Sequence, residues 1–409
     1  MTEASNVPPE PPEEAALSGN TLAASLSLKQ RAGGVIVPVL TVVVAFLMGG
    51  VVVAATGHNP LLAYRDIFTG AGLNWIFHPT TSIVPTASYN LSQTLLQTTT
   101  LILTGLAVAF AFRCGMFNIG GQGQYFVGLY VANWLGVDFA GLNPVAHILL
   151  CIGAATLAGA AWAGIAGVLK ATVGAHEVIS TIMLNWIAIW VGSWLFGDGG
   201  PLQNSANPSV PISNDIANSA KLPVFWGQQE LQGLDIGIFI AVAALIAFWA
   251  ILNRTTLGYE VRAVGFNPDA AAYGGINVRK NLVRAMAISG AFAGLAGAID
   301  MLGYLYHYGQ SDIPFSSVGF LGIAVALLGR NTALGTGLGA LLFGALLFGT
   351  THGLSSNVIA PELAGNLTYI IQGLVVLFIG ADVLILYVWN SRRRLRVRRA
   401  KPAEAVTAA

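Results

Sequence analysis

Long apolar runs separated by short polar connections dominate the sequence. A helix that crosses the ~30 Å hydrocarbon core of a bilayer needs about 20 mainly apolar residues. Ten segments reach or approach that length, and the eighth is short enough to be tilted, broken or re-entrant. They lie at residues 33–56, 95–112, 116–135, 145–169, 178–196, 236–252, 283–304, 316–328, 332–351 and 367–389. The pattern predicts an all-α, polytopic transmembrane helical bundle of about ten spans.

Basic residues sort to one side of this arrangement. Lys and Arg in short loops mark the cytoplasmic face of a membrane protein. When both termini are placed inside, all but two of the 19 basic residues fall in cytoplasmic loops or tails. The exceptions are Arg65 and Lys221. An odd number of spans would break the sorting, so we expect both termini to be cytoplasmic.

The chain divides into one membrane domain and two tails. Residues 1–32 begin with an acidic, Pro-rich stretch, which predicts a disordered cytoplasmic tail rather than a signal peptide. Residues 33–390 form the membrane domain, and residues 391–409 form a basic cytoplasmic tail that would lie near anionic lipid. The multi-pass pattern places the protein in a cell membrane.

Composition excludes several classes of protein. Only 9% of residues are charged and 55% are hydrophobic, whereas an ordinary soluble domain is about 25% charged. The net charge of +1 argues against a nucleic-acid partner, because phosphate binding needs a basic surface. The six histidines are dispersed, and Cys114 and Cys151 lie in or beside apolar runs, so we expect no metal site.

No catalytic or nucleotide-binding motif is found. None of the five lysines follows a glycine, as a P-loop would require. We therefore expect no enzyme activity and no cofactor on this chain. Coupling to an ion gradient would favour ionisable groups at mid-membrane. Asp300 and Asp382 instead lie towards span ends and Glu177 at a span entrance, where interfacial or capping carboxylates are expected.

The inner loop at residues 253–282 contains a predicted short helix. Asn267 is a good N-cap, Pro268 suits the first helical position, Asp269 complements the helix dipole, and Gly274 can end the helix. A rigid knob of this kind suits contact with a cytoplasmic partner. An ordinary structured loop is the alternative.

Polar residues recur on one face of the third predicted span. Asn118, Gln122, Tyr125 and Asn133 share that face at a period of 3.6 residues, so the face must avoid lipid. They either line a polar path or form hydrogen bonds to neighbouring helices. We treat these four as candidate substrate-pathway residues.

The fifth predicted span adds Thr181, Asn185 and Trp186 to this set. An aromatic ring beside amide groups suits a sugar or a nucleobase, although Trp near a span end is also a common interfacial anchor. Small-xxx-small patterns at Gly290 and Gly294, and at Gly335 and Gly339, predict close helix packing.

Five stretches resemble permeases of the branched-chain amino acid and ribose type of ABC importers, and most closely those for nucleosides and simple sugars. The stretches are NPLLAYRDIFTGAG from Asn59, LTGLAVAFAFRCGMFNIGGQGQYFVG from Leu103, HEVISTIMLNWIA from His176, RAVGFNPDAAAYGGINV from Arg262 and ISGAFAGLAGAID from Ile288. This sequence departs mildly at Gly121 and Gln122, where an Ala-Glu pair is usual, and at His176, where Asn is usual.

The resemblance implies an importer that works by alternating access in a bacterial inner membrane. It implies a separate cytoplasmic ATPase that uses ATP and Mg, a second permease in a heterodimer or homodimer, and an extracytoplasmic solute-binding protein. The inner loop would then be the coupling loop that docks on the ATPase. Its candidate residues are Arg262, Val264, Asn267, Pro268, Asp269, Ala271 and Gly274. An ion-coupled secondary transporter of a small polar solute is the alternative.

Overall fold

A computed structural model describes residues 38–77 and 84–353, except 205, 208, 229–231 and 314–316, together with residues 366, 369–371, 373, 374 and 377. The described residues from Phe46 onward belong to the larger of two units of the chain, Phe46–Leu377. The elements that position the candidate sites lie in the larger unit.

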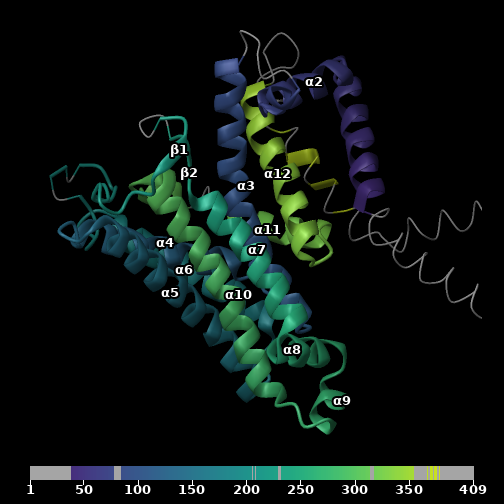
Figure 1. Cartoon of the computed structure of the whole chain (residues 1–409), viewed down its shortest axis with the longest axis vertical. Helices are drawn as coiled ribbons and strands as arrows, with labels where there is room; N and C mark the ends of the chain where they lie inside the picture. The colour runs from purple at the N-terminus through teal and green to yellow at the C-terminus, as the bar shows by residue number, and fades with distance from the viewer. Residues whose placement is uncertain are drawn as a thin grey trace, which may run out of the picture. The chain divides into compact units, whose positions relative to one another are not determined.

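The larger unit is built almost entirely of helices (Figure 1). These are α2 (Pro60–Gly70), α3 (Val84–Arg113), α4 (Gly121–Asp138), α5 (Pro144–Val173), α6 (Glu177–Phe196), α7 (Gly237–Arg254), α8 (Thr256–Phe266), α9 (Pro268–Tyr273), α10 (Val278–Asp300), α11 (Val318–Leu328) and α12 (Ala333–Gly353). Short 3₁₀ turns lie at η1 (Leu73–Ile76) and η4 (Gln310–Asp312), and a π-helical turn, η3 (Met301–Leu305), continues α10. Strands β1 (Val224–Trp226) and β2 (Leu234–Asp235) pair antiparallel, with Val224 opposite Asp235.

Seven of the described helices are long and apolar enough to cross a membrane. They are Pro38–Ala55, Thr86–Arg113, Pro144–Val173, Glu177–Phe196, Gly237–Arg254, Val278–Leu305 and Ala333–Gly353. The third predicted span falls on α4, which is not among the seven, and the eighth falls on α11, which has only 11 residues. Most of the tenth predicted span and both tails lie outside the described residues. The all-α polytopic class is confirmed, while the count of ten and the placement of the termini stay predictions.

Helix α3 lies at the centre of the helical body. It packs against α7, α10, α11 and α12, and most of its length is buried. Helix α10 packs against α4 and α5 on another side. The outward faces of α5, α6 and α7 are apolar, with exposed side chains such as Leu157, Trp190 and Ile246. Apolar residues on the outside of a helix bundle are what a lipid environment requires.

Glycines bring α10 into backbone contact with its neighbours, as the small-xxx-small pattern predicted. A Cβ on Gly290 would lie 2.2 Å from the carbonyl oxygen of Gly159 in α5. A Cβ on Gly128 of α4 would lie 2.4 Å from the carbonyl oxygen of Gly294. In the second predicted pair, a Cβ on Gly335 would lie 2.2 Å from the carbonyl oxygen of Gly329, whereas a Cβ on Gly339 would lie 3.1 Å from that of Val325. Close contact of helices therefore depends on these residues having no side chain.

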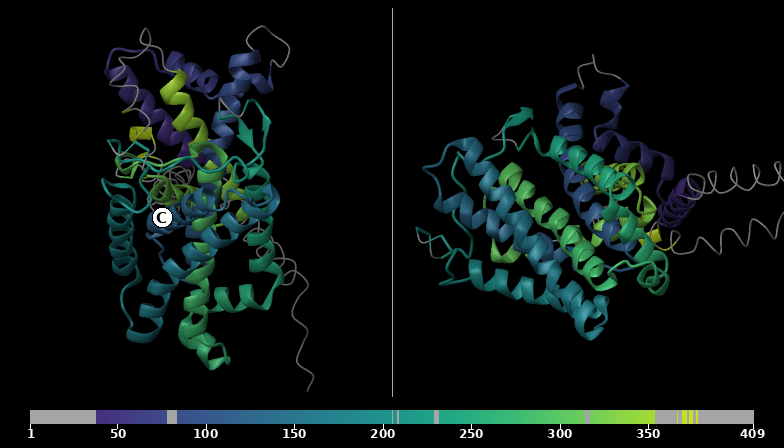
Figure 2. Two further views of the ribbon diagram at one scale, coloured as in Figure 1. Left: turned by 90° about the vertical axis from the view of Figure 1, so that its left-hand side faces the viewer. Right: turned by 60° about the horizontal axis from the view of Figure 1, so that its bottom comes forward.

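Short elements that cannot span a membrane lie at both ends of α10. Helices α8 and α9 lie at its N-terminal end, and the β1–β2 hairpin lies near its C-terminal end (Figures 1 and 2). We call these the α9 end and the hairpin end. The sequence did not predict α8 or the hairpin. In α8, Thr255 caps the helix by accepting a hydrogen bond of 3.1 Å from the Gly258 amide, and Val261 and Val264 are buried.

Candidate functional site

At the α9 end, the predicted capped helix is confirmed. The side-chain oxygen of Asn267 accepts hydrogen bonds from the amides of Asp269 and Ala270, each at 3.0 Å. Pro268 occupies the first helical position, where a missing N–H group costs nothing. Gly275, with φ of +84°, turns the chain out of the helix. The result is a six-residue helix with fixed ends.

The two aromatic side chains that flank α9 are almost fully exposed. Phe266 is 96% exposed and Tyr273 is 98% exposed. Large exposed apolar groups on an ordered element usually mark a contact surface. Neither residue is predicted from the sequence, because a capping pattern does not indicate which aromatic side chains around a helix stay exposed.

The seven predicted coupling residues divide by exposure. Asn267, Pro268, Asp269 and Gly274 are exposed, whereas Val264 and Ala271 are buried and hold α8 and α9 against the bundle. Arg262 is half-buried, and its Nε donates to the carbonyl oxygen of Gly258 at 3.2 Å. A partner would therefore meet the exposed four together with the two aromatic residues.

A buried amide cluster lies where α4 begins. Asn118 Nδ2 donates to Gln124 Oε1 at 2.8 Å and to Ser289 Oγ at 2.7 Å. Its Oδ1 accepts from Gln124 Nε2 and from the Gly120 amide, both at 2.9 Å. Ser289 in turn donates to the Ala107 carbonyl oxygen at 2.5 Å, so α3, α4 and α10 are joined by one polar network.

Three further predicted pathway residues lie in the same region. Asn185 of α6 accepts from the Gly123 amide at 2.8 Å and donates to the Ile119 carbonyl oxygen at 3.0 Å. Gln122 accepts from the amide of Gly319 at 2.6 Å, which joins α4 to α11. Thr181 is buried and donates within α6. The hydrogen bonds of Asn185 and Gln122 hold helices together, and a role of the three residues in lining a path stays a prediction.

Asp300 is fully buried, which corrects the expectation of an interfacial or capping carboxylate. It is 1% exposed, and it accepts hydrogen bonds from Tyr125 Oη at 2.7 Å and from the Thr100 hydroxyl. Its position towards the end of its span is as expected, since α10 ends at Asp300 and η3 continues only to Leu305, but its side chain is buried. Glu177 does lie at the start of α6, where it pairs with Lys170 at 2.8 Å.

Asp235 is a second buried carboxylate at the hairpin end. Its Oδ1 accepts from the Gly237 amide at 2.6 Å, and its Oδ2 is buried with no hydrogen-bond partner among the described residues. Burial raises the pKa of Asp235 to about 6, against the smaller opposing effect of the Gly237 hydrogen bond.

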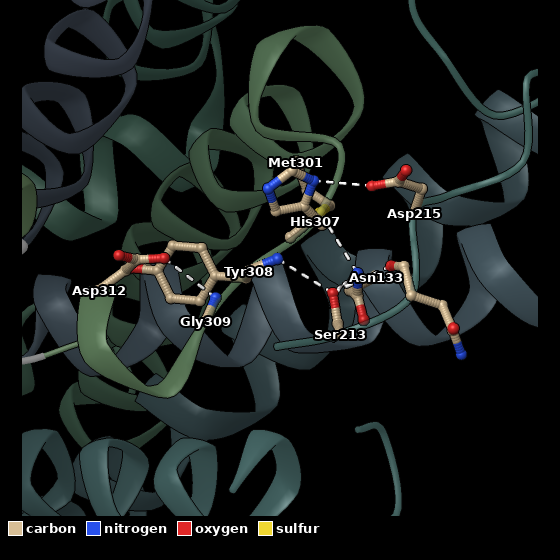
Figure 3. A network of polar contacts seen from close by, with 9 residues as sticks. Asn133, Ser213, Asp215, Met301, His307, Tyr308, Gly309 and Asp312 are labelled. Atoms are coloured by element: carbon tan, nitrogen blue, oxygen red, sulfur yellow. Dashed lines mark hydrogen bonds and ion pairs between the residues drawn. The ribbon is translucent and has the colours of Figure 1, made fainter. Parts of the chain in front are cut away.

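Asn133 belongs to a polar network at the hairpin end (Figure 3). Its Nδ2 donates to Ser213 Oγ at 3.1 Å, and that oxygen accepts from the Tyr308 amide at 3.0 Å. Beside it, His307 Nδ1 lies 2.7 Å from Asp215 Oδ1. The network ties the long loop before β1 to α4 and to the segment after α10.

Trp186 faces away from the buried pathway candidates. It is 55% exposed and lies on the outer face of α6 with Trp190 and Trp194. The three indoles, with Met183, Ile187 and Val191, line a groove of about 490 Å³. Trp186 is thus separated from Asn185, which points into the bundle. Among the described residues, no three His, Cys, Asp or Glu side chains come together as a metal-ligand set.

Comparison with known proteins points to membrane transport. Residues 90–380 match the family described as the permease component of the branched-chain amino acid transport system. A guanosine ABC transporter permease protein of Bacillus subtilis is 36% identical, over 89% of this chain and 98% of that protein. A nucleoside ABC transporter permease protein of Lactococcus lactis is 32% identical, over 86% and 92%. A glucose ABC transporter permease protein of Haloferax volcanii is 33% identical, over 84% and 86%. No solved structure matches the chain.

Proposed function

The chain belongs to the permease family of branched-chain amino acid transport systems, and from that premise we propose that it is the transmembrane subunit of an ATP-driven ABC importer for nucleosides or simple sugars. Solute would cross by alternating access, and a separate ATPase would hydrolyse ATP with Mg. This chain would supply the membrane path and the coupling surface.

The observation that carries the proposal is the exposure of Phe266 and Tyr273 around the rigid helix α9. Each apolar side chain left in water forgoes about 1.5–3 kcal/mol of burial free energy. Aromatic residues are also frequent anchors of protein interfaces. A cytoplasmic ATPase that covers both rings would recover that free energy and would gain a stiff element to push.

Charge supports a cytoplasmic position for the α9 end. Arg262, Arg279, Lys280 and Arg284 all lie in or beside the α8–α9 segment. An excess of Lys and Arg in short loops is typical of the cytoplasmic side. The hairpin end would then face outward, where an extracytoplasmic solute-binding protein would deliver the substrate.

Nucleosides are the first proposed substrate class and simple sugars the second. The Bacillus and Lactococcus relatives are named for guanosine and nucleosides, and the Haloferax relative for glucose. Both bacteria also have a further permease protein similar to this chain, which supports a second permease beside it. Buried polar side chains such as those of Asn118 and Asn185 now form hydrogen bonds within the protein. They would face the path only in a conformation in which solute replaces those hydrogen-bond partners.

An ion-coupled secondary transporter is the second candidate, and buried Asp300 is the observation that favours it. Asp300 ends a helix of 23 residues, about 33 Å from its first residue at a rise of 1.5 Å per residue. It therefore lies near the hairpin end of the bundle rather than at its middle. That position is poor for a relay that must serve both sides of the membrane.

Docking on the ATPase is tested by copurification of the complex. Phe266→Ala combined with Tyr273→Ala should lower the amount of ATPase that copurifies with this chain, because the aromatic anchors are lost. Phe225→Ala, which removes a half-exposed ring at the hairpin end, is the matched control and should leave copurification unchanged. Full retention of the ATPase by the double variant would argue against docking at α9.

Substrate class is tested by uptake into vesicles that contain the assembled transporter. Labelled guanosine should accumulate with ATP present, and excess unlabelled adenosine should compete more strongly than excess glucose. Competition by glucose alone would place the protein with the sugar transporters.

A further inference from the structure

The last turn of α8 touches the end of α3 through backbone atoms. A Cβ on Gly265 would lie 2.3 Å from the carbonyl oxygen of Arg113 and 3.0 Å from the amide nitrogen of Gly115. A Cβ on Gly115 would lie 3.3 Å from the Cα atom of Gly265. Neither contact involves a flexible side chain that could move aside. The backbones of the two helix ends are therefore in direct contact.

The end of α3 is itself rigid. Gly115 has φ of +74°, the left-handed conformation that glycine adopts without strain. The Met116 amide donates to the Ala111 carbonyl oxygen, and the Gly115 amide donates to the Phe112 carbonyl oxygen, both at 3.1 Å. This double hydrogen bond is a Schellman cap, which prevents the helix end from fraying. A push on Gly115 therefore moves the helix rather than unwinding it.

On its other side, the end of α3 holds the turn between α11 and α12. Arg113 donates from Nε at 2.9 Å and from Nη2 at 2.6 Å to the carbonyl oxygen of Asn331. Arg330 and Asn331 both have positive φ, +51° and +53°, which is uncommon for residues other than glycine. Because α11 and α12 also pack along α3, these three helices share one junction.

A single residue connects α8, which forms one side of this junction, to α9. Helix α8 ends at Phe266 and α9 begins at Pro268, so only Asn267 separates them. Helix α8 also contacts α10, where Glu260 accepts from Asn281 at 2.9 Å and lies 3.8 Å from Arg284. Asn281 is buried, but Glu260 and Arg284 are partly exposed side chains that can shift and re-form their contacts after a displacement. The backbone contact at Gly265 has no such freedom.

We propose that Gly265 is a positioning residue that passes movement of α9 into α3 and, through Arg113, into the α11–α12 turn. The inference rests on the proposed function, since it takes α9 as the docking point of the ATPase. A side chain at position 265 would hold α8 away from α3. ATP hydrolysis would then continue while fewer solute molecules cross for each ATP consumed.

The test compares Gly265→Ala with Gly164→Ala in the complete transporter, reconstituted with its ATPase, second permease and binding protein. Gly164 is the matched control, because it lies in α5 away from the docking surface and its Cβ would meet nothing within 4 Å. The readout is labelled nucleoside imported per ATP hydrolysed. Simple destabilisation would lower import and hydrolysis together, whereas loss of the junction lowers their ratio.

We expect Gly265→Ala to lower the ratio by about 2-fold to 30-fold, the range that residues in a coupling network typically show. Gly164→Ala should match the wild type, and a wild-type ratio in Gly265→Ala overturns the inference. If Gly265→Ala does not assemble, Arg113→Lys replaces it, since it keeps the charge but loses the two-nitrogen contact with Asn331. A lowered ratio there supports the inference and an unchanged one overturns it. Absence of ATP-driven import in the wild type would instead contradict the proposed function itself.

Discussion

At the scale of single residues, Asp235 is a buried carboxylate that the fold satisfies only in part. One oxygen accepts a hydrogen bond and the other has no partner among the described residues. Burial raises the pKa of Asp235 to about 6, above the value of about 3.9 in an unfolded chain. The folded state therefore binds this proton more tightly than the unfolded state. Its contribution is most favourable below about pH 4 and is lost as pH rises through 6.

Asp235→Asn should remove this dependence on pH. The melting temperature of the variant, relative to that of the wild type, should rise between pH 4 and pH 6 and then level off, because only the wild type acquires the buried charge. The upper bound is about 3 kcal/mol, from about 1.36 kcal/mol for each unit of pKa shift. Asp198→Asn, at an exposed position before the hairpin, is the control. A difference in melting temperature between Asp235→Asn and the wild type that does not vary with pH would contradict a raised pKa for Asp235.

Asn118 should be structural whatever its role in transport. Asn118→Ala leaves the Gln124 amide and the Ser289 hydroxyl without one of their partners in a buried cluster. Each orphaned group costs about 1–3 kcal/mol, so the detergent-solubilised protein should melt at a clearly lower temperature. Asn253→Ala removes an exposed amide that bonds only within α7 and should change little. Equal melting of the two variants would show that the cluster adds no stability.

Sequence spacing predicted the polar face of α4 but not its partners. Gln122, Tyr125 and Asn133 are buried, as residues that avoid lipid must be. Their bonds run to positions far away in the chain, such as Tyr125 to Asp300, 175 residues on. Periodicity reports which side of a helix is polar, and it has no information about which distant helix covers that side. For the same reason the sequence places Asp300 towards the end of its span but does not predict that its side chain is buried.

At the scale of elements, long apolar runs were the reliable signal. Seven helices of sufficient length and apolar character follow directly from them. Helix α2, with Pro60 after the cap Asn59, and helix α8 are short and non-spanning, so the length of apolar runs does not distinguish them from loops. The short helix α9 was found because its cap combines Asn, Pro and Asp in order. Local chemistry thus predicted an element where hydropathy alone could not.

The contact between α5 and α10 should be sensitive to one methyl group. Gly290→Ala would place a Cβ 2.2 Å from the Gly159 carbonyl oxygen, so the helices must separate and the purified protein should lose thermal stability. Gly164→Ala, on the open side of α5 with nothing within 4 Å, is the matched control and should be neutral. Thermal unfolding in detergent measures both. If Gly290→Ala is as stable as Gly164→Ala, close packing is not what these glycines provide.

At the scale of the whole molecule, the two ends of the bundle have different chemistry. The α9 end has a rigid helix, exposed aromatic residues and several basic side chains. The hairpin end has buried carboxylates and the polar network around Asn133 and Ser213. This division fits a permease that receives force on one side and solute on the other. Under the proposed function, the energy source would be a separate ATPase.

The most direct test of the proposed function is to identify what drives uptake of the solute. Vesicles containing this chain, its second permease and its binding protein would be assayed for labelled guanosine uptake with and without the ATPase. We predict uptake only when the ATPase and Mg-ATP are on the side of the α9 end, and none from a proton or sodium gradient alone. Uptake driven by an ion gradient in vesicles without the ATPase would contradict the account and favour a secondary transporter.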